Sequence, residues 1–134
     1  MDTGYLLDSN VIIDYLAGKI NPCGMKIVSE IVDRTPQMSV ISQIEILRFN
    51  DTPKNEAVLA DFVNASVIHP LNADVVELTI ELCKRDRIKL PNAIIAATAR
   101  VKRLTLVTRN TDDFKSVPSL ELLNPWEQEL SSAL

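Results

Sequence analysis

Hydrophobic and polar residues follow two kinds of pattern along this chain: short continuous apolar runs, and longer segments with apolar residues at helical spacing. Residues 4–7 (GYLL) form an apolar run that ends abruptly at Asp8. The following VIIDYLAG has helical spacing and stops at Gly18. This order predicts a strand, a tight turn and then a helix.

The same alternation continues along the rest of the chain. We predict further helices at residues 26–34, 42–49, 54–64, 74–87 and 92–102, the second of them capped by Ser42. We predict further strands at residues 38–41, 67–68, 104–108 and 120–123, with loops near residues 21–22, 51–53 and 89–91. Strands that alternate with helices pair in parallel through right-handed crossovers. The sequence therefore predicts one α/β domain over residues 1–134, a parallel twisted sheet with helices on both faces.

Composition supports a globular protein of one domain. The chain has 134 residues, of which 46% are hydrophobic and 24% charged, the usual proportions of a soluble domain. No stretch approaches the roughly 20 consecutive apolar residues of a membrane span, and MDTGYLLDSN does not resemble a secretory signal, so we expect a cytoplasmic protein with no membrane segment. Cys23 and Cys83 lack nearby Cys or His partners, which predicts reduced thiols and no zinc site.

Net charge limits how the protein can bind nucleic acid. A formal charge of −4 argues against a protein that coats nucleic acid by bulk electrostatics, because that mode needs a basic surface. Local basic patches remain compatible with this charge. An acidic metal site is compatible with it too, since a divalent ion would offset part of the negative charge.

Polar residues gather directly after the predicted strands. Asp8 follows the first strand, Glu45 lies one turn into the helix after the second, and residues 108–113 follow the LTLV strand. Asn92 stands at the start of the helix that leads into that strand. Ligands of open α/β sheets bind outside the carboxyl ends of the strands, so these residues can converge there. Their oxygen atoms would suit Mg²⁺ or Mn²⁺.

Each of these residues also has a simpler structural interpretation. Asp8 can serve only as a helix cap, and Glu45 can face solvent. Asp112 and Asp113 can be first-turn acids favoured by the helix dipole. Asn92 can simply satisfy free backbone N–H groups at a helix start. Only the joint placement of the four positions favours a functional interpretation.

Four motifs carry a resemblance to a known family. YLLDSNVIIDYL, SQIEIL, LPNAIIAATA and LVTRNTDDF, in this order, resemble the PIN-domain ribonucleases, especially the VapC toxins of bacterial and archaeal toxin–antitoxin pairs. The likeness spans nearly the whole chain. It implies an endoribonuclease that cleaves RNA with Mg²⁺ or Mn²⁺ held by acidic residues at one end of a parallel sheet. It also implies a homodimer and a cognate antitoxin protein that keeps the nuclease inactive.

The resemblance assigns roles to individual residues. Asp8 matches the first metal-binding aspartate, Glu45 the glutamate of the second motif, and Asp113 an acid just before the Phe of the last motif. With position 92 they are the catalytic candidates, and Asp8, Asn92 and Asp113 are the metal-binding candidates. The substrate-binding candidates are the polar residues around them, namely Asn10, Thr108, Arg109 and Asn110.

The last motif varies among relatives of this family. Some place an acid where Asn110 stands here, and others have Asn there with an acid just before the Phe. Asn110, Asp112 and Asp113 therefore all remain open as the fourth residue of the site.

Asn92 departs from the family pattern, which has an aspartate at this position of LPNAIIAATA. An amide keeps the size and one oxygen ligand of the carboxylate but removes its charge and any function as a base. We therefore predict weakened metal affinity and reduced or absent cleavage. The amide is either a natural departure or a change made so that a toxic nuclease can be produced. The alternative function is a catalytically inactive PIN-like domain that binds RNA or an antitoxin.

Other ionisable groups add little to the catalytic hypothesis. His69, beside Pro70, lies outside the motifs, so no pair of histidines is available for catalysis. RNA would need positive charge near an acidic site, and Arg109 and the clusters KRDRIK (84–89) and RVKR (100–103) are candidates for phosphate contacts. Both clusters are equally compatible with solvated helix faces.

Overall fold

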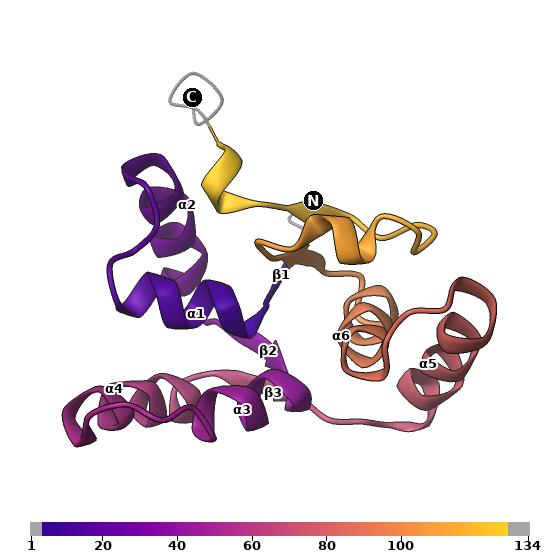
Figure 1. Ribbon diagram of the computed structural model, residues 1–134, viewed down its shortest axis with the longest axis horizontal. Coiled ribbons are helices and arrows are strands. Elements are labelled where there is room, and N and C mark those ends of the chain that lie inside the picture. Colours follow the sequence, from indigo (N-terminus) through magenta and orange to yellow (C-terminus); the bar gives the residue numbers. More distant parts are fainter. Residues whose placement is uncertain (1–3, 129–134) are drawn as a thin grey trace.

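Short parallel strands form the centre of the fold in the computed structural model, which describes residues 4–128 (Figure 1). β4 (Thr105–Val107) lies between β1 (Tyr5–Leu7) and β5 (Leu122–Leu123). β2 (Gln37–Ser39) pairs with β3 (Val67–His69), and β2 lies beside β1. All the hydrogen-bonded pairs are parallel, which confirms the predicted α/β class, although the sheet is divided into two adjoining ladders. The ends of the predicted domain, residues 1–3 and 129–134, lie outside the described residues.

Helices cover both faces of the strands, as predicted. They are α1 (Ser9–Leu16), α2 (Pro22–Asp33), α3 (Val40–Leu47), α4 (Pro53–Asn64), α5 (Ala73–Asp86) and α6 (Leu90–Val101). In Figure 1, α5 and α6 lie together on one side of the strands, and α1 and α2 lie on the other side. Two short 3₁₀ helices follow β4 and β5: η1 (Thr111–Phe114) and η2 (Pro125–Glu127). No helix in the described part of the chain is long and apolar enough to span a membrane.

The strands divide the hydrophobic core into two clusters. Leu6 pairs with Leu106, and both belong to the cluster formed with α5 and α6. Their neighbours Leu7 and Val107 also pair, but they belong to the cluster formed with α1, α2 and α4. Successive side chains of a strand point to opposite faces, so the three-residue strands serve both clusters. Residues 93–99 of α6 are all buried, which makes this helix a rigid support for the residue at its N-terminal end.

Two predicted element boundaries were wrong. The cap of α3 is Ser39 and not Ser42, because the Ser39 hydroxyl accepts hydrogen bonds from the backbone N–H groups of Ile41 (3.1 Å) and Ser42 (3.3 Å). The β-branched pair at 40–41 suggested a longer strand, but these residues already belong to the helix. α2 starts at Pro22, four residues before the predicted start, since Asn21 caps it by accepting from the Gly24 N–H (2.8 Å).

The segment that contains η2 is attached to α2. The Asn21 side chain donates to the backbone oxygen of Trp126 (2.8 Å), and the Asn124 side chain donates to the backbone oxygen of Arg109 (3.2 Å). These bonds hold the loop after β4 against the rest of the fold. The close approach requires a glycine in α2, because a Cβ at Gly24 would lie 2.2 Å from the Pro125 oxygen.

The substitution Gly24→Ala is expected to destabilise the protein. Its Cβ would also lie 2.5 Å from Ile20 Cγ2, and overpacking of this kind costs about 1–3 kcal/mol. Thermal unfolding would show this as a lower Tm. Gly18→Asn is the control, because Gly18 (φ +70°) has open space around its missing Cβ and Asn tolerates this conformation. Equal melting temperatures for Gly24→Ala and the parent chain would contradict the tight contact.

Candidate active site

Asp8 lies where β1 meets α1, and its carboxylate is held from three directions. Oδ1 accepts from the backbone N–H of Ser9 (2.8 Å), and Oδ2 accepts from the Thr108 hydroxyl (2.8 Å) and from Asn10 Nδ2 (3.3 Å). Its own backbone N–H donates to the oxygen of Val107 (3.0 Å). The carboxylate therefore joins the ends of the adjacent strands β1 and β4. Capping of α1 is part of its role, but the bond from Thr108 goes beyond a local cap.

The charge of Asp8 is poorly compensated. The residue is only 6% exposed, and burial is the main cause that raises the pKa of its carboxyl group. The negative charge of Glu45 raises this pKa further, while the hydrogen bonds from Thr108, Ser9 and Asn10 lower it. A cation beside the carboxylate would relieve this unfavourable burial of charge.

Glu45 lies in α3, half-buried, and reaches the start of α1. The hydroxyl of Ser9 donates to Glu45 Oε1 (2.9 Å). Within the described residues no hydrogen bond is made by the other carboxylate oxygen of Glu45. The fold thus brings Asp8 and Glu45 together, as the sequence predicted. Sequence reasoning did not assign Ser9 to the site, although its place beside Asp8 in the DSN motif was a signal for it.

The candidate substrate-binding residues form a hydrogen-bonded network around Asp8. Asn10 Oδ1 accepts from the backbone N–H of Arg109 (3.2 Å), and the Thr108 hydroxyl accepts from the backbone N–H of Asn110 (3.1 Å). Thr108 is fully buried and holds Asp8 on one side and the loop on the other. These contacts favour a positioning role for Asn10 and Thr108.

Arg109 is engaged by neighbours that the sequence analysis did not connect with it. Its guanidinium Nη1 lies 3.8 Å from Asp14 Oδ2, and its Cζ lies 4.9 Å from the centre of the Trp126 ring. An ion pair and a cation–π contact together anchor this side chain. Its exposed edge remains accessible, because 58% of the side-chain surface is exposed.

Asn92 and Asp113 line a pocket of about 250 Å³ between the α5–α6 loop and η1. Its other lining residues are Asp86, Arg87, Ile88, Lys89 and Ser116. α6 begins at Leu90 with Lys89 at its N-cap and has no side-chain cap. The interpretation of Asn92 as a helix cap was therefore wrong, and its amide is available to the pocket.

The geometry favours Asp113 over the other candidates for the fourth site residue. Asp113 shares the pocket with Asn92. The neighbouring Asp112 is 83% exposed in its side chain and forms an ion pair with Lys115. The exposed Asn110 uses its backbone N–H to bond Thr108 and has no side-chain hydrogen bond that caps η1. Of these three candidates, Asp113 is thus the one that lines a pocket together with position 92.

The structure brings the four candidates together as two pairs, which form the two halves of the candidate site: Asp8 with Glu45 through Ser9, and Asn92 with Asp113 in a shared pocket. Among residues 4–128 no group of three His, Cys, Asp or Glu side chains is placed to hold a metal ion. The donors present are carboxylate and amide oxygens, which fit Mg²⁺ or Mn²⁺ better than softer metals. An aspartate at position 92 would add a carboxylate to this set.

The remaining ionisable groups lie elsewhere. His69 Nε2 is bonded to Gln37 Oε1 (2.8 Å) between β2 and β3, and burial is the main cause that lowers its pKa. The RVKR cluster lies at the opposite end of α6 from Asn92, about 12 Å along the axis for eight residues. KRDRIK instead spans the end of α5 and the loop to α6, and its residues 86–89 line the pocket.

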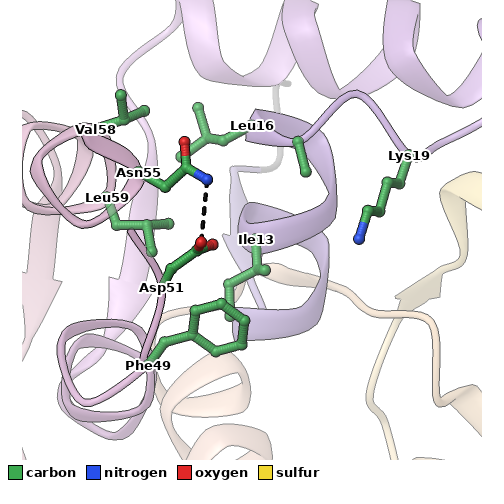
Figure 2. A pocket seen from close by; sticks show the side chains of 9 residues that line it. Ile13, Leu16, Lys19, Phe49, Asp51, Asn55, Val58 and Leu59 are labelled. Carbon is green, nitrogen blue, oxygen red and sulfur yellow. Dashed lines mark hydrogen bonds between the residues drawn. The ribbon is translucent and has the colours of Figure 1, made fainter. Parts of the chain in front are cut away.

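A second, apolar pocket lies between α1 and α4. Figure 2 shows its apolar side chains around the hydrogen bond from Asn55 to Asp51 (3.1 Å). Ile13 and Leu16 come from α1, Val58 and Leu59 from α4, and Phe49 from the segment between α3 and α4. Phe49 and Val58 are exposed. Exposed apolar side chains around a hollow are typical of a surface that binds a partner.

Comparison with known proteins identifies the family to which this chain belongs. The profile of the PIN domain matches residues 5–120. The chain belongs to the PIN domain family. This match confirms the resemblance that the four motifs carry. A separate search of curated proteins finds no match.

Solved structures with this fold come from toxin–antitoxin complexes. A toxin–antitoxin complex from Klebsiella pneumoniae contains a chain of 27% identity and TM-score 0.74, and the match covers 93% of this chain and 100% of that one. VapBC2 from Rickettsia felis, bound to a promoter DNA fragment, matches at 24% identity and TM-score 0.73 over 90% and 97% of the two chains. FitAcB from Neisseria gonorrhoeae matches at 24% identity and TM-score 0.75, and the match covers 92% of this chain and 99% of that one. The last two show the likeness of fold alone.

Asp8→Asn is expected to stabilise the metal-free protein at neutral pH. The amide has the same size, and its one oxygen can still accept from Thr108 and Asn10, but its NH2 group loses the bond from the Ser9 N–H. We expect removal of the buried charge to outweigh the loss of this one bond. Thermal unfolding in EDTA measures the effect, and a gain of about 1 kcal/mol corresponds to a rise in Tm of about 4 °C. Asp112→Asn is the matched control, since this exposed carboxylate should change Tm little. A lower Tm for Asp8→Asn would mean that the hydrogen bonds outweigh the cost of burial.

Proposed function

We propose that this chain is a Mg²⁺- or Mn²⁺-dependent endoribonuclease of the VapC toxin type, with activity reduced by Asn92. The observation that carries the proposal is the buried Asp8 carboxylate, held beside Glu45 where β1 and β4 end. PIN domains are typically metal-dependent nucleases. Structural neighbours in toxin–antitoxin complexes support the toxin type.

Each residue of the candidate site has its own role in this proposal. Asp8 and Asp113 would hold a divalent ion together with the oxygen of residue 92, and Glu45 would add its free carboxylate oxygen. When bound, such an ion activates water and offsets charge that develops on the phosphate. Thr108 and Ser9 keep the two carboxylates of Asp8 and Glu45 oriented. Preorganised ligands of this kind lower the cost of binding the ion.

The second candidate function is a PIN domain that binds RNA or an antitoxin without cleavage. Asn92 favours it, because an amide supplies neither the charge nor the base that a carboxylate would. The arrangement of the acids favours it too, since within residues 4–128 no three His, Cys, Asp or Glu side chains are grouped so that they could hold a metal ion. Restoring the carboxylate separates the two functions.

Protein partners form part of the proposal. An antitoxin segment would cover the apolar pocket between α1 and α4, where Phe49 and Val58 are exposed. A homodimer would use the outer face of α5, where Val76 and Ile80 lie one turn apart and are 38% and 54% exposed. Burial of such side chains is the usual driving force of association.

Asn92→Asp is expected to raise RNA cleavage in Mg²⁺ or Mn²⁺ by about 100-fold or more, the usual contribution of a catalytic carboxylate. The assay compares it with the parent chain and Asn92→Ala on total cellular RNA, with EDTA as the metal control. The double variant with Asp8→Asn should be inactive. If Asn92→Asp binds Mn²⁺ in calorimetry but cleaves no RNA, the binding function replaces the nuclease.

Ile80→Lys is expected to convert a dimer to a monomer of 14.9 kDa, measured by light scattering. A charged side chain in an apolar interface would be buried without a partner, which is costly. Val58→Lys is the matched control, because Val58 is also exposed (42%) but belongs to the apolar pocket. A parent chain that is already monomeric, or an Ile80→Lys variant that stays dimeric, rejects α5 as the interface.

A further inference from the structure

Basic side chains near the candidate site differ in whether an acid neutralises them. Arg85 Nη2 lies 3.0 Å from Glu81 Oε1, Lys115 pairs with Asp112, and Arg109 contacts Asp14. Arg87 and Lys89, by contrast, form no salt bridge in the described part of the chain. These two unneutralised cations line the same pocket as Asn92 and Asp113.

The backbone of Arg87 has a conformation that glycine would adopt at lower cost. Arg87 ends α5 in the left-handed conformation (φ 55°, ψ 35°). Glycine is the favoured residue at such a position, and a side chain with a Cβ is strained there. Thr35, Arg103 and Ser119 also have positive φ, so it is the place of Arg87 in the pocket that distinguishes this residue. The exposed guanidinium of Arg87 lies at the pocket without a structural bond that would account for it.

The pocket is lined by both negatively and positively charged side chains. Asp86 contributes a carboxylate oxygen, Oδ2, that is buried and makes no hydrogen bond, although Arg85 Nε is 3.9 Å away. Asp113 adds a second carboxylate, and Arg87 and Lys89 supply the positive charge. A phosphodiester beside a carboxylate-held cation needs this combination, because basic side chains bind its oxygens while the acids bind the metal.

We propose that Arg87 and Lys89 bind the phosphate backbone of single-stranded RNA in this pocket, next to the bond that is cut. The inference rests on the proposed function, since Asn92 and Asp113 of the same pocket are there assigned to the metal. The pocket of about 250 Å³ brings these two cations together with Asn92 and Asp113. Proteins that recognise RNA commonly bind single-stranded segments of it.

The test measures binding of a fluorescently labelled single-stranded RNA oligonucleotide by anisotropy, in EDTA, at several salt concentrations. The parent chain is compared with Arg87→Gly, Lys89→Ala and Arg85→Ala, a control from the last turn of α5 whose arginine is already paired. Arg87→Gly and Lys89→Ala should each weaken binding about three- to tenfold. Each should also reduce the slope of log Kd against log salt by about 0.7, the value for one phosphate contact on a single strand.

Arg87→Gly also separates binding from folding. Glycine fits the left-handed conformation of residue 87, so the Tm of this variant should equal or exceed that of the parent while its RNA affinity falls. Arg85→Ala should keep the affinity within about twofold and leave the salt slope unchanged, because that charge is neutralised in the parent.

Each other outcome overturns the inference. If Arg87→Gly and Lys89→Ala bind like Arg85→Ala, the RNA lies elsewhere and the proposed nuclease function is unaffected. If all three variants lose affinity equally, the contribution is diffuse charge and not this pocket. If the parent chain binds an RNA duplex as tightly as the single strand, the ligand is not specifically single-stranded RNA. If the parent chain binds no RNA, both the inference and RNA as the substrate are rejected. Loss of binding in Arg87→Gly and Lys89→Ala, without cleavage by Asn92→Asp, would support RNA binding in this pocket but reject the nuclease and the place of the RNA next to a bond that is cut.

Discussion

The buried carboxylate of Asp8 is the constraint on which the site depends. Three hydrogen bonds hold it, from residues 9 and 10 at the start of α1 and from Thr108 after β4. Through Ser9 it is linked to Glu45 in α3. Burial makes this charge costly, since it raises the pKa of the Asp8 carboxyl group. Buried charges of this kind are concentrated at functional sites, and in the proposed function the charge of Asp8 binds a cation.

The two halves of the site are held by different parts of the fold. Asp8 and Glu45 are fixed by the junctions of short strands with α1 and α3, while Asn92 and Asp113 depend on α6 and η1. The buried α6 gives position 92 a firm place. Carboxylates repel one another, so a divalent cation is what would draw the halves together. An amide at position 92 weakens that attraction because it lacks a charge, but it also reduces the repulsion in the metal-free protein.

Local patterns were enough to predict the class of fold and the convergence of Asp8 with Glu45. Apolar runs followed by polar residues mark strand ends, and strand ends meet at one edge of a parallel sheet. The start of α3 was wrong because β-branched residues at 40–41 suit both strand and helix, and the cap at Ser39 settles the choice. The cap of α2 was readable in Asn21-Pro22. Contacts such as Arg109 with Trp126 depend on chain segments brought together by folding, so no local pattern indicates them.

Arg109 and Arg87 show why a count of basic residues says little about RNA binding in this chain. Both are exposed arginines beside the candidate site, but Arg109 is bound to Asp14 and Trp126 and helps to anchor the loop after β4. Arg87 has no such partner among the described residues and occupies a backbone conformation that glycine would fill at lower cost. Three of the basic residues near the site, Arg85, Arg109 and Lys115, are each paired with an acid. Arg87 and Lys89 form no such pair within the described residues, and in the proposal their position beside Asn92 decides where a phosphate of the RNA strand lies.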